Sequence, residues 1–181
     1  MLKNRAQLDR FLASVEASAY RMAYAATSQR EEALDIVQDS MMKLVTKYAN
    51  KPSEQWKPLF YRILQSRIRD WYRKQKVRSI MGSVFNRNSN EQEYSLLEAS
   101  ADRQDWEPEN KLSINQSMQQ LQLAVNELPL KQQQVFLLRM IEQADVKETA
   151  DIMGCSTGTV KTHLSRAMQK LRGVLGEKVL T

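Results

Sequence analysis

The stretch from Val146 to Arg172 reads VKETADIMGCSTGTVKTHLSRAMQKLR and decides how the C-terminal part of the chain folds. Apolar residues recur at helical spacing as far as Gly154, and glycine readily takes the left-handed conformation that ends a helix. Ser156 then stands at an N-cap position, because its hydroxyl can accept a hydrogen bond from a free backbone N–H. One face of the following segment is apolar, at Val160, Leu164, Ala167 and Leu171. The pattern predicts two helices joined by a tight turn.

The second of these helices directs polar and basic side chains away from its apolar stripe. They are Thr159, Lys161, Thr162, His163, Ser165, Arg166 and Lys170. A helix-turn-helix whose second helix is polar suits the major groove of DNA. An ordinary helical hairpin with solvated charges is the alternative that this motif alone leaves open.

The composition favours an all-α protein. The chain has 181 residues, enough for one large domain or two small ones, and it contains only 5 Gly and 4 Pro. The single Cys155 excludes an internal disulfide and a multi-cysteine metal site. No long uncharged apolar run resembles a membrane span or a signal peptide, so we expect a soluble, cytoplasmic protein without membrane insertion.

Charge is distributed unevenly around a net value of +6. Lys and Arg against Asp and Glu number 16 to 8 in residues 1–78, 2 to 7 in residues 79–110, and 9 to 6 in residues 111–181. The acidic middle segment also lacks helical periodicity and is rich in Ser and Asn. We therefore predict two small helical domains, 1–78 and 112–181, joined by a flexible acidic linker over 79–111.

The N-terminal domain should begin with two amphipathic helices, from about Asn4 to Thr27 and then to about Tyr48. The second helix carries four residues outside its apolar stripe at i, i+3, i+4 and i+7, a spacing that places them on one face. They are Asp35, Gln38, Asp39 and Met42, called the acidic patch below. This patch suits a basic partner helix, although a solvated helix face remains open as the alternative.

Two prolines bracket the polar run from Asn50 to Pro58 and predict a loop. A helix then follows from Leu59 to about Arg78, with an apolar stripe at Phe60, Leu64, Ile68 and Trp71. A second stripe, called the basic face below, consists of Arg62, Arg69, Arg73 and Lys76.

Tyr61 and Tyr72 border these stripes, and aromatic rings beside basic side chains suit single-stranded nucleic acid. We therefore interpret the helix as a surface for single-stranded nucleic acid. Phe60 and Trp71 are predicted to belong to the core instead. An anionic membrane or an acidic protein is an alternative partner.

Helical periodicity resumes at Leu112 and stops at Leu128-Pro129. A further helix is marked by Val135, Leu138 and Ile141, before the predicted helix-turn-helix. The C-terminal domain should therefore contain four helices.

Two blocks of the sequence resemble the sigma factors of bacterial RNA polymerase, in the extracytoplasmic-function group of the sigma-70 superfamily. The run from Glu127 to Arg172 looks like the domain that binds the −35 promoter element. It has a Leu-Pro start, the Glu148-x-Ala150 step, and Gly158-Thr159-Val160-Lys161 at the start of the recognition helix. The runs EEALDIVQDSMMKLV and LFYRILQSRIRDWYRK are similar to the domain that binds the polymerase clamp and melts the −10 element. Both blocks follow the family's order and cover nearly the whole chain.

The resemblance implies specific roles for residues of this sequence. The acidic patch would contact the clamp helices of core RNA polymerase, and the family also contacts the polymerase flap. The −10 element would be bound by Asn50, Lys51, Ser53, Trp56, Arg62, Arg67, Asp70 and Arg73. The −35 element would be bound by Ser156, Thr157, Thr159, Lys161, Thr162, His163, Ser165 and Arg166. Ser66, Leu59 and His163 depart from the family's usual Asn, Trp and Arg and bear on which promoter sequence is read.

The resemblance further implies promoter DNA as a partner, an anti-sigma protein as an inhibitor, and a linker that threads the channels of the polymerase. We expect no enzymatic activity, no catalytic residues, no metal, no cofactor and no small-molecule substrate, because the one His and the one Cys have no evident partner. Cys155 is interpreted as a small buried residue, with a thiol redox switch as the alternative. A stand-alone dimeric helix-turn-helix regulator, which would bind palindromic DNA by itself, is the competing hypothesis. An adaptor that binds no DNA is a third.

Overall fold

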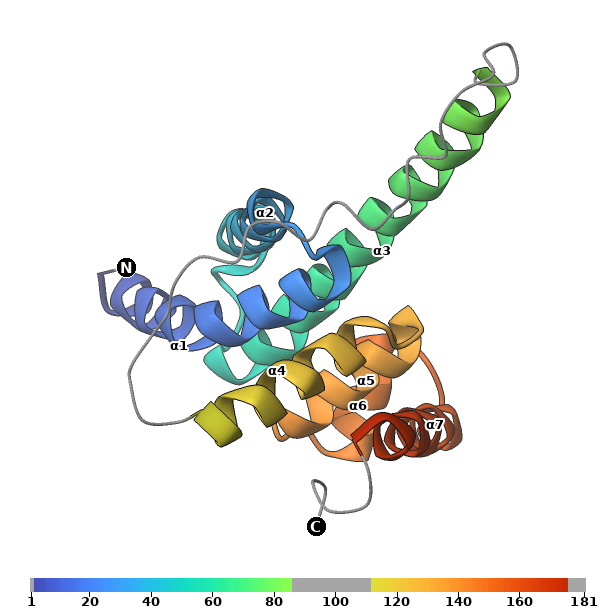
Figure 1. Ribbon diagram of the computed structural model, residues 1–181. Helices are drawn as coiled ribbons and strands as arrows, with labels where there is room; N and C mark the ends of the chain where they lie inside the picture. Colours follow the sequence, from blue (N-terminus) through green and yellow to red (C-terminus); the bar gives the residue numbers. More distant parts are fainter. Residues whose placement is uncertain (1, 86–111, 176–181) are drawn as a thin grey trace.

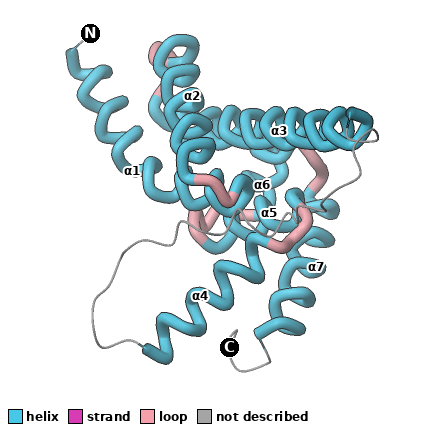
Figure 2. Tube along the Cα trace, turned by 45° about the horizontal axis from the view of Figure 1, so that its top comes forward, coloured by secondary structure: helices cyan, strands magenta, loops and turns pink. Residues whose placement is uncertain are grey.

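The computed structural model describes residues 2–85 and 112–175, and every regular element in those two ranges is an α-helix (Figures 1 and 2). The helices are α1 (Leu2–Thr27), α2 (Arg30–Tyr48), α3 (Ser53–Phe85), α4 (Leu112–Asn126), α5 (Leu130–Met140), α6 (Val146–Met153) and α7 (Thr157–Leu175). The all-α expectation is confirmed. Most of the predicted acidic linker lies outside the described residues.

Helices α1, α2 and α3 pack together through the apolar stripes that the sequence indicates. Phe60, Leu64 and Ile68 of α3 are completely buried, as are Met22 of α1 and Leu44 of α2. Burial of a large apolar side chain stabilises a fold by about 1.5–3 kcal/mol. These side chains therefore fix α3 against the other two helices and determine which of its faces remains outside.

The predicted loop over Asn50–Pro58 is wrong, because α3 begins at Ser53 and includes Pro58. Proline in a helix interior removes one backbone hydrogen bond and costs ~3 kcal/mol. Here the cost is offset by the buried rings on either side, since Trp56 is 1% exposed and Phe60 is fully buried. The Trp56 indole also donates a hydrogen bond to the Tyr48 carbonyl at 3.2 Å, which ties the start of α3 to the end of α2.

Two further features of α3 differ from the sequence prediction. The helix continues beyond Arg78 to Phe85, so its C-terminal end enters the segment expected to be linker. Tyr61, which was placed at the border of the basic face, is fully buried and its hydroxyl lies 2.8 Å from the Ser18 hydroxyl. It therefore belongs to the core, whereas Tyr72 is 42% exposed.

The four predicted C-terminal helices are present, with α5 in their middle. Six consecutive α5 residues, Gln133 to Leu138, are buried, which requires neighbours on every side of the helix. Gly154 ends α6 in the left-handed conformation (φ 66°, ψ 44°), as predicted. Met118 of α4 is 60% exposed, so this apolar side chain lies outside the core.

The two halves of the chain pack against each other (Figure 1). Helix α6 contacts α3, and α4 and α5 contact α1, so buried apolar residues from both halves form one continuous core. The C-terminal end of α3 projects beyond this packed region (Figures 1 and 2). No pattern in the sequence indicates this contact, which places α3 against the first helix of the helix-turn-helix.

Candidate nucleic-acid and protein interfaces

The tight turn between α6 and α7 positions the predicted recognition helix. The Ser156 hydroxyl accepts a hydrogen bond from the Thr159 N–H at 3.1 Å, so the predicted N-cap is formed. Val160, Ala167 and Leu171 are fully buried against the rest of the domain. Because this stripe anchors one face of α7, the opposite face is held rigidly toward solvent.

Among the eight residues predicted to bind the −35 element, some side chains form hydrogen bonds within the start of α7 and others are exposed to solvent. Ser156 and Thr159 bond each other within the cap at 2.9 Å, and the Thr162 hydroxyl donates to the Gly158 carbonyl at 3.0 Å. Lys161 and Arg166 are exposed, as are Thr157 and Ser165. The two cations are therefore the α7 side chains best placed to contact phosphates or base edges.

His163 lies at the edge of this surface and is partly buried. Its Nδ1 is buried without a hydrogen-bond partner among the described residues. Burial lowers the pKa of His163 below its usual 6.5, and the nearby charges of Lys131 and Arg166 lower it further. The shift favours the neutral imidazole, so His163 adds less positive charge to α7 than a freely exposed histidine would.

Cys155 is partly buried between α6 and α7, where it packs against the small cluster of Val135, Ala150 and Val160. Burial raises the pKa of its thiol, and the positive charge of Lys131 only partly opposes this effect. Because the thiolate is the reactive form, this environment supports the interpretation of Cys155 as a packing residue.

On α2, all four members of the acidic patch are exposed, and Met42 is 62% exposed. The α2 residues between them, Ile36, Val37 and Ser40, are buried, so the patch occupies the outer face of the helix. The Asp39 carboxylate lies 3.9 Å from the Arg67 guanidinium. The acidic patch thus borders α3 directly.

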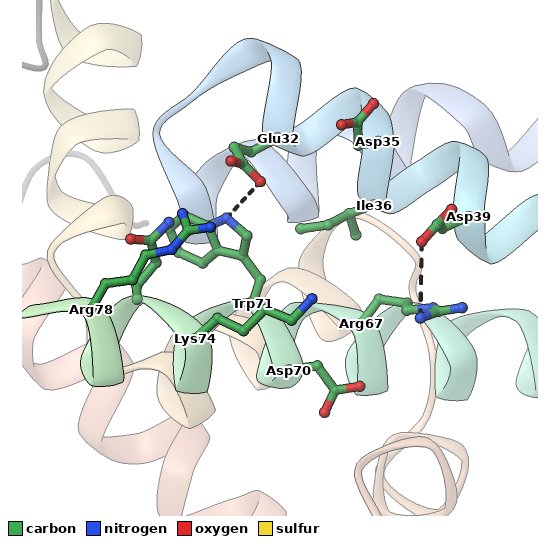
Figure 3. Close-up of a pocket in the computed structure, with 10 residues that line it drawn as sticks. Glu32, Asp35, Ile36, Asp39, Arg67, Asp70, Trp71, Lys74 and Arg78 are labelled. Carbon is green, nitrogen blue, oxygen red and sulfur yellow. Dashed lines mark hydrogen bonds and ion pairs between the residues drawn. The ribbon is translucent and has the colours of Figure 1, made fainter. Parts of the chain in front are cut away.

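A cleft between α2 and α3 has an acidic wall on α2 and a mainly basic wall on α3 that also includes Asp70 (Figure 3). Glu32, Asp35 and Asp39 come from α2, whereas Arg67 and Lys74 come from α3. The Trp71 indole donates to the Glu32 carboxylate at 2.8 Å. Arg67 Nε is buried without a hydrogen-bond partner in the described part of the chain. Sequence reasoning did not select Glu32, Lys74 or Arg78 for this site, because their proximity depends on how α2 crosses α3.

The residues predicted to bind the −10 element are only partly brought together. Asn50, Lys51 and Ser53 are exposed at the turn between α2 and α3. Arg67, Asp70 and Arg73 lie further along α3, and the Arg73 guanidinium is 3.8 Å from the Asp70 carboxylate. Trp56 does not belong to this surface, because its ring is buried in the core.

Arg62 differs from the other basic residues of α3, because it faces the C-terminal domain. Its guanidinium donates a hydrogen bond to the backbone carbonyl of Asp151 on α6 at 3.2 Å. Five residues earlier on α3, the Lys57 ammonium lies 3.5 Å from the Glu142 carboxylate. The C-terminal domain thus engages part of the positive charge at the start of α3.

Within 2–85 and 112–175, no group of three or more His, Cys, Asp or Glu side chains is arranged to hold a metal ion. No helix in the described part of the chain has the length and apolar character needed to cross a membrane.

The family described as Sigma-70, region 4 matches residues 118–171, which include α5, α6 and most of α7. The RNA polymerase sigma factor SigV of Bacillus subtilis (strain 168) is 30% identical over 157 residues, covering 84% of this chain and 81% of SigV.

Two solved structures share the fold. The sigma factor RpoE from Bartonella quintana, in complex with the anti-sigma factor NepR, has a TM-score of 0.64 and 24% identity, over 94% of this chain and 97% of RpoE. CnrH, in complex with the cytosolic domain of CnrY, has a TM-score of 0.57 and 17% identity, over 93% of this chain and 86% of CnrH.

The helix-turn-helix and the N-terminal helices together thus have a counterpart over most of a sigma factor, which does not favour a stand-alone dimeric regulator. The chain belongs to the extracytoplasmic-function sigma factors of the sigma-70 superfamily, the subunits that give bacterial RNA polymerase its promoter specificity.

Proposed function

We propose that this sigma factor divides its work between its two halves, with residues 1–78 binding core polymerase and the −10 element and residues 112–181 binding the −35 element. The observation that carries the proposal is the capped helix α7, which presents Lys161 and Arg166 opposite its buried stripe. Such a helix can enter a major groove without any rearrangement of its own domain.

The proposal for α7 is tested by replacing Lys161 and Arg166 with Ala, each alone and together. We expect each change to weaken binding to a promoter that needs its −35 element by about 1–3 kcal/mol, since a specific base contact has that value. Affinity for core polymerase should stay unchanged. The control is Lys47→Ala, which removes an exposed lysine on α2. Equal transcription by the wild type and the double variant would contradict the assignment.

For core polymerase, we propose the acidic patch on α2 as the site that receives the clamp helices. Support comes from the exposure of Asp35 and Gln38 beside an exposed apolar side chain, Met42, since interfaces combine apolar contact with a polar rim. The proposed contact of the sigma factor with the polymerase flap is assigned to residues 112–181.

For the −10 element, we propose Asn50, Lys51 and Ser53 at the α2–α3 turn together with Arg62, Arg67, Asp70 and Arg73 on α3. Exposed basic side chains bind the phosphates of the strand, and the exposed ring of Tyr72 offers a stacking surface for a base. Alanine substitution of Tyr72 should reduce promoter opening, measured by permanganate reactivity of unpaired thymines. The Tyr72→Phe variant should retain opening, because it keeps the ring.

We further propose that the protein acts in the cytoplasm, performs no catalysis itself, and is held inactive by an anti-sigma protein. The last point is supported by the described complexes of two proteins with the same fold, RpoE with NepR and CnrH with the cytosolic domain of CnrY. Affinity purification of the tagged protein from its own cells tests it. Polymerase subunits and one further small protein should be recovered, and recovery of polymerase alone before and after induction would argue against an inhibitor.

A further inference from the structure

Three side chains that can carry positive charge lie together where α5 meets the start of α7. Val135 of α5 and Val160 of α7 belong to one small buried cluster. Lys131 precedes Val135 by one helical turn on the same face of α5, and it is exposed. His163 and Arg166 are three residues apart on α7, and the charges of Lys131 and Arg166 both act on the His163 ring. We call Lys131, His163 and Arg166 the cationic cluster.

The cationic cluster has no acidic partner within 2–85 and 112–175. In these ranges Lys131 and Arg166 form no ion pair, and no carboxylate of α5, α6 or α7 acts on the His163 ring. Helix α4, which also packs against α7, contains no charged residue. Burial raises the pKa of Cys155 in the turn before α7, so this thiol is uncharged at pH 7. The cluster therefore lacks an anion that would balance its charge.

Two features favour the neutral form of the His163 ring. Its Nδ1 is buried without a hydrogen-bond partner in the described part of the chain, and protonation there would leave a buried donor unsatisfied. Burial and the two neighbouring cations also lower the pKa of the imidazole. A bound anion would oppose this shift, because an opposite charge within ~4–6 Å favours the protonated form of a histidine. The anion would also offer an acceptor to a ring N–H.

We propose that the cationic cluster binds one backbone phosphate of the promoter duplex, and that His163 takes up one proton from solvent when this phosphate binds. A phosphate suits the site because it combines negative charge with several acceptor oxygens, and because the cluster lies on the helix that we propose for the major groove. Lys131 extends the DNA-binding surface from α7 onto α5. The inference rests on the proposed role of α7 in binding the −35 element.

The first test needs no DNA. His163 is the only histidine of the chain, so NMR can follow its titration directly in the full-length protein. Lys131→Ala should raise the pKa of the imidazole, because it removes a repelling charge. Lys147→Ala, which removes an exposed lysine of α6, is the control and should leave this pKa unchanged. An unchanged pKa in the Lys131→Ala protein would show that the two residues are too far apart to share a phosphate.

The second test concerns proton uptake. Because the promoter complex would bind one more proton than the free protein, lower pH should strengthen promoter binding. Holoenzymes with wild-type protein or with His163→Gln, which cannot titrate, are compared between pH 8 and pH 6 on a promoter that needs its −35 element. The ratio of the two affinities should increase several-fold in favour of the wild type, by at most about tenfold per pH unit. A constant ratio would overturn proton uptake.

The third test locates the phosphate. Uncharged methylphosphonate linkages are placed one at a time along both strands at the −35 element. At one linkage the substitution should weaken binding, remove the pH dependence that His163 confers, and leave Lys131→Ala without further effect. On unmodified DNA, Lys131→Ala should lower the slope of log affinity against log salt by about 1, whereas Lys131→Arg should retain the slope.

If no single linkage behaves in this way, the phosphate site is wrong, even where Lys161→Ala weakens promoter binding as expected for α7. If Lys161→Ala and Arg166→Ala also have no effect, the proposed role of α7 itself fails. The free-protein titration is independent of both outcomes, since it measures only whether Lys131 lies close to His163.

Discussion

Helices α3 and α7 both present cations to solvent, but they hold them in different ways. On α7, Lys161 and Arg166 lack ion-pair partners among the described residues, and the helix start is fixed by the Ser156 cap. On α3, Arg67 faces Asp39 and Arg73 faces Asp70, while Arg62 bonds to the C-terminal domain. If α7 is the recognition helix, as we propose, its two cations can bind DNA without losing an ion pair, whereas Arg62, Arg67 and Arg73 of α3 would exchange internal partners for phosphates.

The comparison indicates that α7 and α3 gain their affinity for DNA in different ways. A free, ordered cation gains the full value of a phosphate contact, because no existing interaction is lost. A paired cation gains only the difference between its two partners, and exposed ion pairs contribute about 0–1 kcal/mol. Helix α7 should therefore dominate the salt-dependent affinity for duplex DNA, while α3 depends on other polymerase contacts that bring the strand to it.

The largest effect should come from reversing the charge of the acidic patch on α2. Reversing Asp35 and Asp39 to Lys should abolish binding to core polymerase, because like charges across an interface cost several kcal/mol. Helix content should change little, since both side chains are exposed. Core affinity is measured beside circular dichroism.

The control for this variant reverses Asp9 and Glu16, two exposed acids of α1, to Lys. This control should bind core polymerase normally, because it makes the same charge change away from the acidic patch. A folded Asp35→Lys, Asp39→Lys protein that binds core polymerase at wild-type strength would show that the patch is misassigned.

The difference between α7 and α3 is tested directly by removing one arginine from each helix. In the holoenzyme, Arg166→Ala should reduce promoter affinity by about 1–3 kcal/mol and lower the slope of log affinity against log salt by about 1. Arg73→Ala should reduce the affinity by up to ~1 kcal/mol less than Arg166→Ala does, because a phosphate contact of Arg73 replaces its exposed ion pair with Asp70. Equal effects of the two variants would mean that the ion pairs of α3 do not matter for binding.

A smaller effect on stability is expected at the turn that orients α7. Gly154 has a positive φ of 66°, and a Cβ there would meet no atom within 4 Å. Gly154→Ala should therefore destabilise the protein by about 1–2 kcal/mol through backbone strain alone. Gly173→Ala is the matched control inside α7 and should stabilise by about 0.5–1 kcal/mol. Urea unfolding distinguishes the two, and a Gly154→Ala protein of unchanged stability would refute the backbone argument.

The smallest effect concerns pH. The pKa of His163 is lowered in the folded protein, so below about pH 6.5 the unfolded chain binds more protons than the folded one. The stability contribution of neutral His163 should be complete above this pH and decrease as the pH falls toward the folded pKa. Wild-type protein should therefore lose more stability than His163→Gln between pH 7 and pH 5, measured by urea unfolding at each pH.

Local signals were sufficient to predict the helix-turn-helix. Gly154 and Ser156 act through their own backbone and the adjacent turn, so their roles are visible in a few residues of sequence. The apolar stripe of α3 was equally clear, because burial of Phe60, Leu64 and Ile68 follows helical spacing. The acidic patch was grouped correctly on one face of α2 for the same reason.

Features that depend on contacts between distant segments were missed. Pro58 indicated a loop because its local cost is plain, whereas the compensating burial of Trp56 depends on tertiary packing. Gln65 and Gln134 read as ordinary polar positions, although they meet across 69 residues of sequence. The pairing of Arg67 with Asp39 likewise depends on how α2 crosses α3. A single sequence carries no signal for such contacts when the partners are common polar residues.

The glutamines of α5 also bear on how the protein avoids aggregation. If Gln133 and Gln134 were leucines, separation of the two halves would expose an apolar strip on α5, and exposed apolar patches promote association between chains. Amides in these positions are readily hydrated once exposed, so this surface of α5 would stay compatible with water if the two halves separated. The same amides that link α1, α3 and α5 in the packed molecule would thus limit association between chains if the two halves separated.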